Sequence, residues 1–286
     1  FFAQNRIQLN ERLLLGLGLR FDYRNVDRGS EFSYKSFSDV SPKINLTFKR
    51  DNFSTWNFAL SKGFRSPSLS ELFLQYESDY GLNTQGNPNL EPEQLYGLDI
   101  SFDRSNKSNL TYSVSTFYYK YEDMIDFVYG LPVIALNRSD ISSCGLETNI
   151  SYQINSNFNL DLGYTYLRVN DINNVDPILY RPNNKFISSI KYKSDKISHI
   201  ISMRYQSEQD YQDFLSDERE YEGSEIKFPI EQLDSLILFN YIGSYELNNR
   251  DKISLKISNL FDKQYELIQD FPMPGRTISL MYDKTF

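Results

Sequence analysis

The chain has 286 residues, a formal net charge of -8 and an aromatic content of 15%. The negative charge argues against nucleic acid as a partner, and the single cysteine, Cys144, excludes an internal disulfide. No run of about 18 apolar residues occurs, which excludes a helical membrane span. No glycine-rich phosphate loop, Cys-x-x-Cys pair or His-Glu-x-x-His motif is present, so the sequence indicates a protein that is not an enzyme.

Alternating apolar and polar residues predict strands along the whole chain. The clearest case is 13–24, where the leucines and aromatics from Leu13 to Tyr23 alternate with glycines and charged residues. A longer segment, 133–154, is expected to be one strand that bends near Ser142 and Ser143. In chain order, the thirteen predicted strands are 1–9, 13–24, 44–48, 56–60, 94–103, 110–118, 133–154, 158–166, two that flank 194–196, 232–246, 253–258 and 278–286.

The connections between these strands are of two alternating kinds. Six are tight polar turns, and six are long loops, at 26–38, 61–93, 122–132, 171–181, 208–230 and 259–275. Short turns at one end, long loops at the other and strands of about ten residues are typical of transmembrane β-barrels. A soluble sandwich, β-helix or propeller is the alternative, but these folds use shorter strands, and a repeat array would show internal repeats that are not found.

Two stretches carry motifs. The strand around 56–60 is expected to end at Gly63, where the first motif begins. GFRSPSLSELF runs from Gly63 to Phe73, and GNPNLEPE runs from Gly86 to Glu93 in the longest loop. Near the other end, KISNLFDKQYE begins at Lys256, and a last strand ends in Phe286. These sequences resemble the paired motif and the closing segment of TonB-dependent outer-membrane receptors, and the resemblance covers residues 13–286.

The resemblance implies an all-β fold, a transmembrane antiparallel β-barrel. Residues 1–286 are expected to be the C-terminal portion of a single barrel domain, about 13 strands of a 22-stranded barrel, with the N-terminal plug missing. The segment FFAQ at residues 1–4 is no signal peptide, and an odd number of strands fits a chain that begins inside a barrel. Phe286 is expected to be the terminal signal read by the barrel-assembly machinery, with an aromatic at the membrane interface as the equal alternative.

The function implied by the resemblance is energy-coupled uptake of a scarce, large ligand through the cell outer membrane of a Gram-negative bacterium. The implied partners are outer-membrane lipid, the TonB complex through the missing plug, the barrel-assembly machinery, a small-molecule ligand and a surface lipoprotein. A haem or glycan receptor of the same family, or a passive porin, is the alternative.

The sequence favours cobalamin over a ferric siderophore as the ligand, because YEDMIDF at 121–127 and the segment at 259–266 are similar to parts of the cobalamin receptor. Haem is weakened because no histidine lies at 68–87, and His199, the only histidine, is expected at a membrane interface or in the lumen; axial ligation by tyrosine keeps haem open. Siderophores are anionic, and the arginines that would form a basic patch for them are Arg65, Arg138, Arg168, Arg181 and Arg204.

The predicted ligand-binding residues lie in the long loops and combine aromatic, charged and amide side chains. They are Arg65, Tyr76, Glu77, Asp79, Tyr80, Asn87, Asn89, Tyr129 and Tyr211. No cofactor is certain from the sequence. Calcium is the candidate, because carboxylates bind hard cations, and its predicted ligands are Asp210, Asp213, Asp217 and Glu218 in the acidic loop; a solvated acidic loop is the alternative.

Overall fold

The computed structural model describes residues 1–26, 35–77, 83–105, 109–128, 132–137, 140–172, 178–213, 216, 218, 220–222 and 225–285. One antiparallel sheet of 13 strands dominates it, and consecutive strands of this sheet are neighbours throughout. The strands, in order across the sheet, are β1 (Phe2–Asn10), β2 (Leu13–Val26), β3 (Lys35–Lys49), β4 (Ser54–Arg65), β7 (Glu93–Ser105), β8 (Leu110–Glu122), β11 (Ile141–Gln153), β12 (Phe158–Asp171), β13 (Asn184–Ser194), β14 (Ile197–Gln206), β19 (Leu236–Glu246), β20 (Asp251–Ser258) and β21 (Thr277–Lys284).

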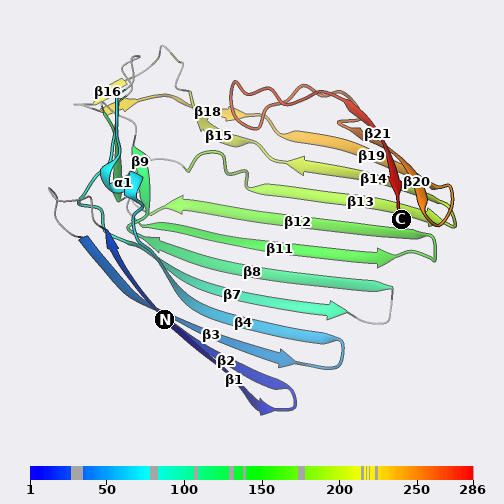
Figure 1. Cartoon of the computed structure of the whole chain (residues 1–286), viewed down its shortest axis with the longest axis horizontal. Helices are drawn as coiled ribbons and strands as arrows, with labels where there is room; N and C mark the ends of the chain where they lie inside the picture. The colour runs from blue at the N-terminus through cyan, green and yellow to red at the C-terminus, as the bar shows by residue number, and fades with distance from the viewer. Residues whose placement is uncertain are drawn as a thin grey trace.

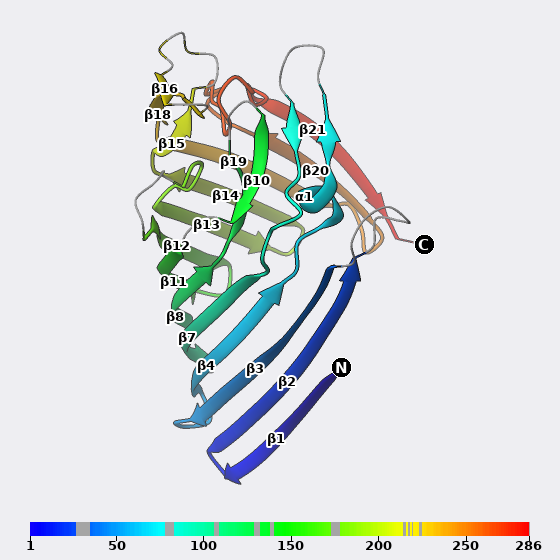
Figure 2. The ribbon, with the colours of Figure 1, turned by 90° about the vertical axis from the view of Figure 1, so that its left-hand side faces the viewer.

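The sheet curves into an open trough, as Figures 1 and 2 show. Tight turns lie at one end of the strands, and the long connections gather at the other end with α1 (Leu69–Phe73) (Figure 1). The expectation of an antiparallel sheet of thirteen strands with alternating turns and loops is therefore confirmed. Among the described residues, no helix is long and apolar enough to cross a membrane.

The long connections contain small sheets of their own. One has the order β5 (Gln75–Tyr76), β6 (Thr84–Gln85), β10 (Val133–Asn137) and β9 (Ile125–Val128), and the others pair β15 (Gln209–Gln212) with β18 (Ile230–Leu233) and β16 (Glu220–Glu222) with β17 (Glu225–Lys227). Figure 2 shows β10 and α1 at the long-loop end of β4 and β7. We call this end of the sheet the rim.

Several predicted boundaries were wrong. The segment 133–154 is two strands in two sheets, β10 and β11, rather than one bent strand. The segment 232–246 likewise divides between β18 and β19, and the loop at 26–38 is shorter than expected because β2 reaches Val26 and β3 begins at Lys35. The strand expected to end at Gly63 continues to Arg65, and the loop after it contains a helix.

The two faces of the main sheet differ in polarity, because alternate residues of a strand point to opposite sides. On one face the register aligns Ile44, Leu60, Leu98 and Tyr118 across β3, β4, β7 and β8. On the opposite face, hydrogen bonds join Thr47 to Asn57 and Asn57 to Ser101, at 3.0 and 3.2 Å. We call these the apolar face and the polar face.

Aromatic rings line the apolar face near the tight turns. Trp56 lies 4.7 Å from Phe102, which lies 5.8 Å from Tyr112, as distances between ring centroids. His199 continues the line further along the sheet, stacked between Tyr192 and Tyr241 at 6.2 and 5.9 Å. Its Nδ1 lies 2.8 Å from the Tyr241 hydroxyl. A belt of aromatics at a membrane interface is typical of transmembrane barrels. His199 was expected at such an interface or in the lumen; it lies on the apolar face, and its place at a membrane interface stays a prediction.

A cluster of buried hydrophobic side chains lies at the rim. It joins residues of β2 and β3 to α1, β9 and β10, so that segments distant in sequence are fixed to one another. Its buried members are Val26, Phe37, Leu72, Leu90, Ile125 and Ala135, with Phe64, Phe73 and Phe127 packed against them.

Candidate ligand-facing rim and lumen wall

Arg65 is the last residue of β4 and lies opposite Glu93, the first residue of β7. Its Nε and one terminal nitrogen each donate to Glu93 at 2.6 Å, and the other terminal nitrogen donates to both oxygens of Glu71 at 3.0 Å. The two carboxylates are 14% and 15% exposed, whereas the arginine is 44% exposed. Arg65 thus ties the ends of two strands to the helix between them.

Helix α1 begins with a capping box. The Ser68 hydroxyl accepts from the Glu71 amide at 3.2 Å, and Glu71 accepts from the Ser68 amide at 2.7 Å. Burial by itself would raise the pKa of Glu71, but the hydrogen bonds from Ser68 and the guanidinium of Arg65 outweigh it and hold this pKa below its ordinary value of 4.5. The Ser-x-x-Glu spacing from Ser68 to Glu71 is a local sequence signal for the start of a helix, in a stretch that was predicted to be a loop without one.

The second half of the motif packs directly onto the helix. The Gly86 amide donates to the Leu74 carbonyl at 2.7 Å and the Asn87 amide to the Glu71 carbonyl at 2.8 Å. A Cβ at Gly86 would lie 2.6 to 2.7 Å from backbone atoms of residues 72–74, so only glycine fits. Asn87 also closes its own turn, because its Oδ1 accepts from the Asn89 amide at 2.9 Å.

The rim turn is also held from β3. The Lys35 ammonium donates to the carbonyls of Leu90 and Pro88 at 2.6 and 3.1 Å. On its other side, Asn137 of β10 accepts from the Glu91 amide at 2.8 Å and donates to the Asp123 carbonyl at 2.7 Å. The motif is therefore an ordered brace, which we call the rim brace: residues 63–73 and 86–93.

The later long connections are joined to one another in a similar way. Tyr211 of β15 is buried, and its hydroxyl donates to Glu231 of β18 at 2.6 Å. This hydrogen bond and burial raise the pKa of the Tyr211 phenol. The Gln209 side chain donates to the Leu267 carbonyl at 2.9 Å, and the Tyr180 amide donates to the Asp210 carbonyl at 2.8 Å. These contacts connect the loops at 171–181, 208–230 and 259–275.

The segment NLFDKQY closes on itself after β20. Asn259 is buried at φ 51°, and its side chain both donates to the Lys263 carbonyl at 2.8 Å and accepts from the Lys263 amide at 2.9 Å. Asp262 accepts from the Arg276 amide at 2.6 Å, which ties the loop to the start of β21. The motif thus makes a compact turn from its own side chains.

The predicted ligand-binding residues have different surroundings. Arg65 and Asn87 belong to the rim brace, and Tyr211 is buried against Glu231. Tyr76 and Glu77 are exposed near β5, and Asn89 is exposed in the rim turn. Asp79, Tyr80 and Tyr129 lie outside the described residues, as does Phe286. The role of these residues in binding stays a prediction.

The predicted calcium ligands are not gathered among the residues that the structure describes. Asp210 accepts from the Gln232 side chain at 3.0 Å, and within the described ranges no group of three or more acidic, histidine or cysteine side chains could hold a metal ion. Asp213 and Glu218 are described, whereas Asp217 lies outside. The calcium site stays a prediction.

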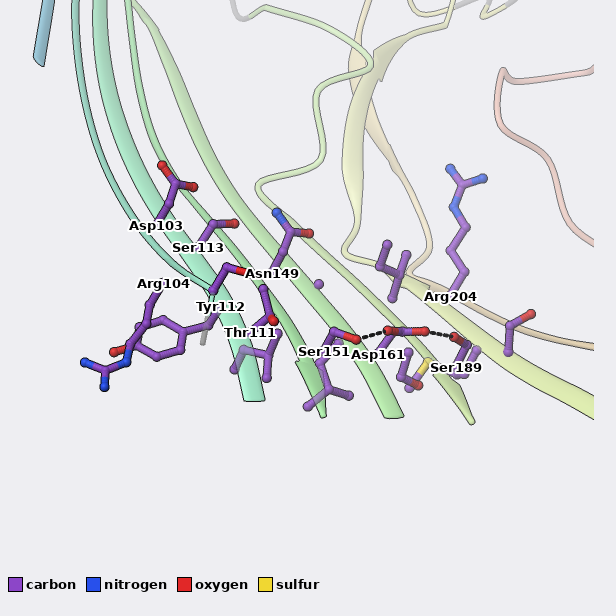
Figure 3. A pocket seen from close by; sticks show the side chains of 18 of the residues that line it. Asp103, Arg104, Thr111, Tyr112, Ser113, Asn149, Ser151, Asp161, Ser189 and Arg204 are labelled. Atoms are coloured by element: carbon purple, nitrogen blue, oxygen red, sulfur yellow. Dashed lines mark hydrogen bonds between the residues drawn. The ribbon is translucent and has the colours of Figure 1, made fainter. Parts of the chain in front are cut away.

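A cavity of about 630 Å³ lies along β7, β8, β11, β12, β13, β14 and β19. Near its centre, Asp161 accepts from Ser151 at 2.7 Å and from Ser189 at 3.3 Å (Figure 3). Lys191 completes the cluster through an ion pair of 2.7 Å with Asp161. The cavity lining therefore presents both hydroxyl and charged groups on the polar face of the sheet.

Among the described residues, the arginines of the predicted patch do not all lie on one face of the sheet. Arg204 lies in register with Ile187, and Ile187 with Gly163, on the polar face and beside the cavity. Arg168 lies on the opposite face, because it is five residues along the same strand from Gly163 and alternate residues change face. Arg138 lies outside the described residues.

Comparison with known proteins agrees with this architecture. Residues 1–260 match the family model described as TonB dependent receptor-like, beta-barrel. The "Iron-regulated outer membrane virulence protein" of Vibrio cholerae is 24% identical over 227 residues, which are 73% of this chain and 33% of that protein. "Transferrin-binding protein A" of Haemophilus influenzae is 28% identical over 131 residues, 44% of this chain and 14% of that protein.

Solved structures show the same fold over the whole chain. "Copper transporter OprC" has a TM-score of 0.82 at 20% identity, and the siderophore receptor PirA from Acinetobacter baumannii has 0.78 at 17%. Both alignments cover 100% of this chain, and 47% and 45% of the respective structures. The chain therefore spans less than half of these structures and about a third of the first relative. Together with the family match, the sheet and its two faces show that the chain belongs to the β-barrel family of TonB-dependent receptors.

Proposed function

We propose that this chain forms part of an outer-membrane receptor for TonB-dependent uptake of an iron chelate, with a ferric siderophore as the first ligand to test. The match of residues 1–260 to the receptor family carries the proposal. The ligand class is supported by the names of the relatives, which refer to iron regulation, transferrin and a siderophore. Transport, rather than catalysis, is the activity proposed for the whole protein.

The preference for cobalamin receives no support from these relatives. Their names refer to iron, transferrin, a siderophore or copper. We therefore place an iron chelate first and keep cobalamin as the comparison ligand. The haem, glycan and passive-pore alternatives gain no support either.

The two ends and two faces of the sheet suggest a division of roles. In a closed barrel the apolar face meets lipid and the polar face lines the lumen, which places the Asp161 cluster on the lumen wall. The rim brace holds the outer connections in place, and side chains that it leaves exposed, such as Tyr76 and Glu77, are candidates for the first ligand contact. Family membership implies that a plug fills the lumen and couples it to the TonB complex, in the cell outer membrane.

The barrel-assembly machinery and a surface lipoprotein stay predicted partners. So do the domain assignment of residues 1–286 and the count of 22 strands in the whole barrel. Each of these predictions concerns the complete protein, and this chain covers only part of the length of its relatives.

An uptake experiment with the complete receptor tests the proposal. The full gene is expressed in a Gram-negative host that lacks siderophore receptors, with and without TonB, and cells receive siderophore-bound radioactive iron or labelled cyanocobalamin. We expect iron accumulation only when receptor and TonB are both present. Accumulation that persists without TonB would identify a passive pore, and uptake of cyanocobalamin alone would overturn the choice of ligand.

A further inference from the structure

Two aromatic rings lie next to each other on the polar face of β8. The register places Tyr119 opposite Gly97 of β7 and Phe117 opposite Gly145 of β11. The rings stack on each other, with centroids 5.1 Å apart and planes 19° apart. We call Phe117 and Tyr119 the aromatic platform.

Glycines on the flanking strands let these rings lie against the sheet. A Cβ at Gly97 would lie 3.0 Å from two ring carbons of Tyr119, and a Cβ at Gly145 would lie 2.8 Å from Cε1 of Phe117. Both glycines are buried, whereas both rings stay partly exposed on the polar face. Covering a glycine with a ring stabilises a sheet by itself, so the case for a ligand depends on the charges around the rings.

Two carboxylates flank the aromatic platform. Asp99 lies opposite Phe117 and accepts a hydrogen bond from the Tyr119 hydroxyl at 2.6 Å. Glu147 is exposed and lies on the same face of β11 as Gly145, at the next position along that face. Among the residues that the structure describes, no lysine or arginine forms an ion pair with either carboxylate.

The wall around the aromatic platform carries charge of one sign. Strands β7, β8, β11 and β12 are described over their whole length. Every charged side chain on their polar face is a carboxylate, namely Glu93, Asp99, Asp103, Glu147, Asp161 and Asp171. Glu93 and Asp161 have cationic partners on the adjoining strands, Arg65 of β4 and Lys191 of β13. This part of the wall therefore attracts cations and repels anions.

An organic ammonium group fits these surroundings. The faces of aromatic rings attract cations, most strongly where water is excluded, and carboxylates beside the rings add charge-assisted hydrogen bonds. A metal ion fits less well, because within the described ranges no three acidic, histidine or cysteine side chains gather to hold one. An anionic group would be repelled by both Asp99 and Glu147.

We propose that the aromatic platform, together with Asp99 and Glu147, binds an ammonium group of the imported iron chelate. On β7, Asp99 lies between Glu93 of the rim brace and Asp103 of the lumen cavity, so a ligand that moves from the rim toward the cavity passes the platform. This inference rests on the proposed function and names its ligand class. The expected ligand is an amine-bearing ferric hydroxamate, whose iron centre is neutral, rather than a ferric catecholate, whose iron centre is anionic.

Binding to the complete receptor in detergent tests the site with two probes that differ by a single charge. The first probe is a linear ferric trihydroxamate with a free terminal amine, and the second is the same chelate with that amine acetylated. We expect the wild type to bind the amine form about tenfold more tightly, which corresponds to about 1.4 kcal/mol and lies within the range for a cation on an aromatic face. This preference should decrease as salt is added, because it is electrostatic.

Two variants locate the source of the preference. Glu147→Gln removes an exposed charge with little change of shape, and Phe117→Leu keeps an apolar group near Gly145 but removes the ring. Each should reduce the preference to about threefold or less and leave binding of the acetylated chelate unchanged. The control Glu246→Gln removes a carboxylate from the polar face of β19, opposite Lys252, and should keep the full preference. Resistance of the barrel to detergent denaturation without heating shows that each variant has folded.

A ferric catecholate as a third probe separates this inference from the proposed function. Equal binding of the two hydroxamates by the wild type, tighter binding of the catecholate, or a preference that both variants retain would overturn the ammonium site and leave uptake of iron chelates in place. A control variant that loses the preference would also overturn the site. If none of the three chelates binds or delivers iron to cells in a TonB-dependent manner, the proposed function fails and the inference fails with it.

Discussion

Replacing Arg65 with glutamine tests whether the FRSP–NPNL motif acts as a brace at the rim. Each of the three guanidinium nitrogens donates to a carboxylate, at 2.6 Å for Glu93 and 3.0 Å for Glu71. Glutamine is shorter, has no charge and can replace at most one of these contacts. The variant leaves two largely buried carboxylates without their shared cation.

The size of the effect follows from the exposure of the three groups. Removing one partner of a fully buried ion pair costs about 3–5 kcal/mol, whereas an exposed pair contributes about 0–1 kcal/mol. The carboxylates are 14% and 15% exposed but the arginine is 44% exposed, so an intermediate loss of about 2–3 kcal/mol is expected. The loss should be local, because the 13-stranded ladder does not depend on this contact.

Hydrogen exchange in the complete receptor measures this local stability. The reporters are the amides of Leu74, Gly86 and Asn87, which donate within the rim brace. In the Arg65→Gln variant they should exchange about 30-fold to 150-fold faster, the factor that corresponds to about 2–3 kcal/mol. Amides of the β2–β3 ladder should be unchanged.

A matched control distinguishes the brace from a general effect of charge. Arg20 pairs with Asp22 at 2.6 Å, but the two side chains are 53% and 36% exposed, so Arg20→Gln should change exchange little. Arg65→Lys keeps the charge but loses the planar fork and should fall between the wild type and the glutamine variant. Unchanged exchange in Arg65→Gln would refute the brace, as would an equal increase in Arg20→Gln.

Three further predictions concern the same end of the molecule. Gly86→Ala should destabilise the rim brace by about 1–3 kcal/mol, because the new Cβ meets backbone atoms at 2.6 to 2.7 Å. Hydrogen exchange of the α1 amides measures this loss. The control Gly18→Ala should have little effect, because its Cβ would lie 3.7 Å from the nearest atom. The stabilisation that Glu71 provides is present above pH 4.5 and should be lost as the pH falls through its depressed pKa; exchange of α1 measured as a function of pH should therefore show a loss that Glu71→Gln abolishes. Asn259→Ala removes two hydrogen bonds to Lys263 at a positive φ, so trypsin should cut after Lys263 about 5-fold to 30-fold faster, for about 1–2 kcal/mol of lost protection. An Asn259→Gly variant that is cleaved at the wild-type rate would contradict the role of the side chain.

The main strands could be predicted from sequence because the two faces of the sheet have different environments. In β2, apolar residues alternate with glycine or charged residues from Leu15 to Arg24, and the register confirms that the two sets occupy opposite faces. The segment 133–154 shows the limit of this signal. Val133–Asn137 and Ile141–Gln153 both read as strands, and nothing in their composition indicates that they belong to different sheets.

The rim contacts were harder to predict because they join residues distant in sequence. Arg65 and Glu93 are 28 positions apart, and their pairing depends on where β4 ends and β7 begins. If the predicted strand had been extended from Gly63 to residue 65, the register between β4 and β7 would have placed Arg65 opposite Glu93. The capping box of Ser68 and Glu71 is a local signal that sequence reading could have used.

The polar side chains of the two motifs bond to other groups of their own loops. This explains why the motifs identify the protein family but do not identify the ligand. Arg65 uses its nitrogens on Glu71 and Glu93, and Asn259 uses both polar atoms of its side chain on the backbone of Lys263. Groups that satisfy one another inside a loop have little left with which to distinguish a siderophore from cobalamin. A ligand preference inferred from such motifs therefore reflects how the loops are held together. Discrimination between ligands must come from side chains that these loops expose to solvent and from the polar face of the barrel.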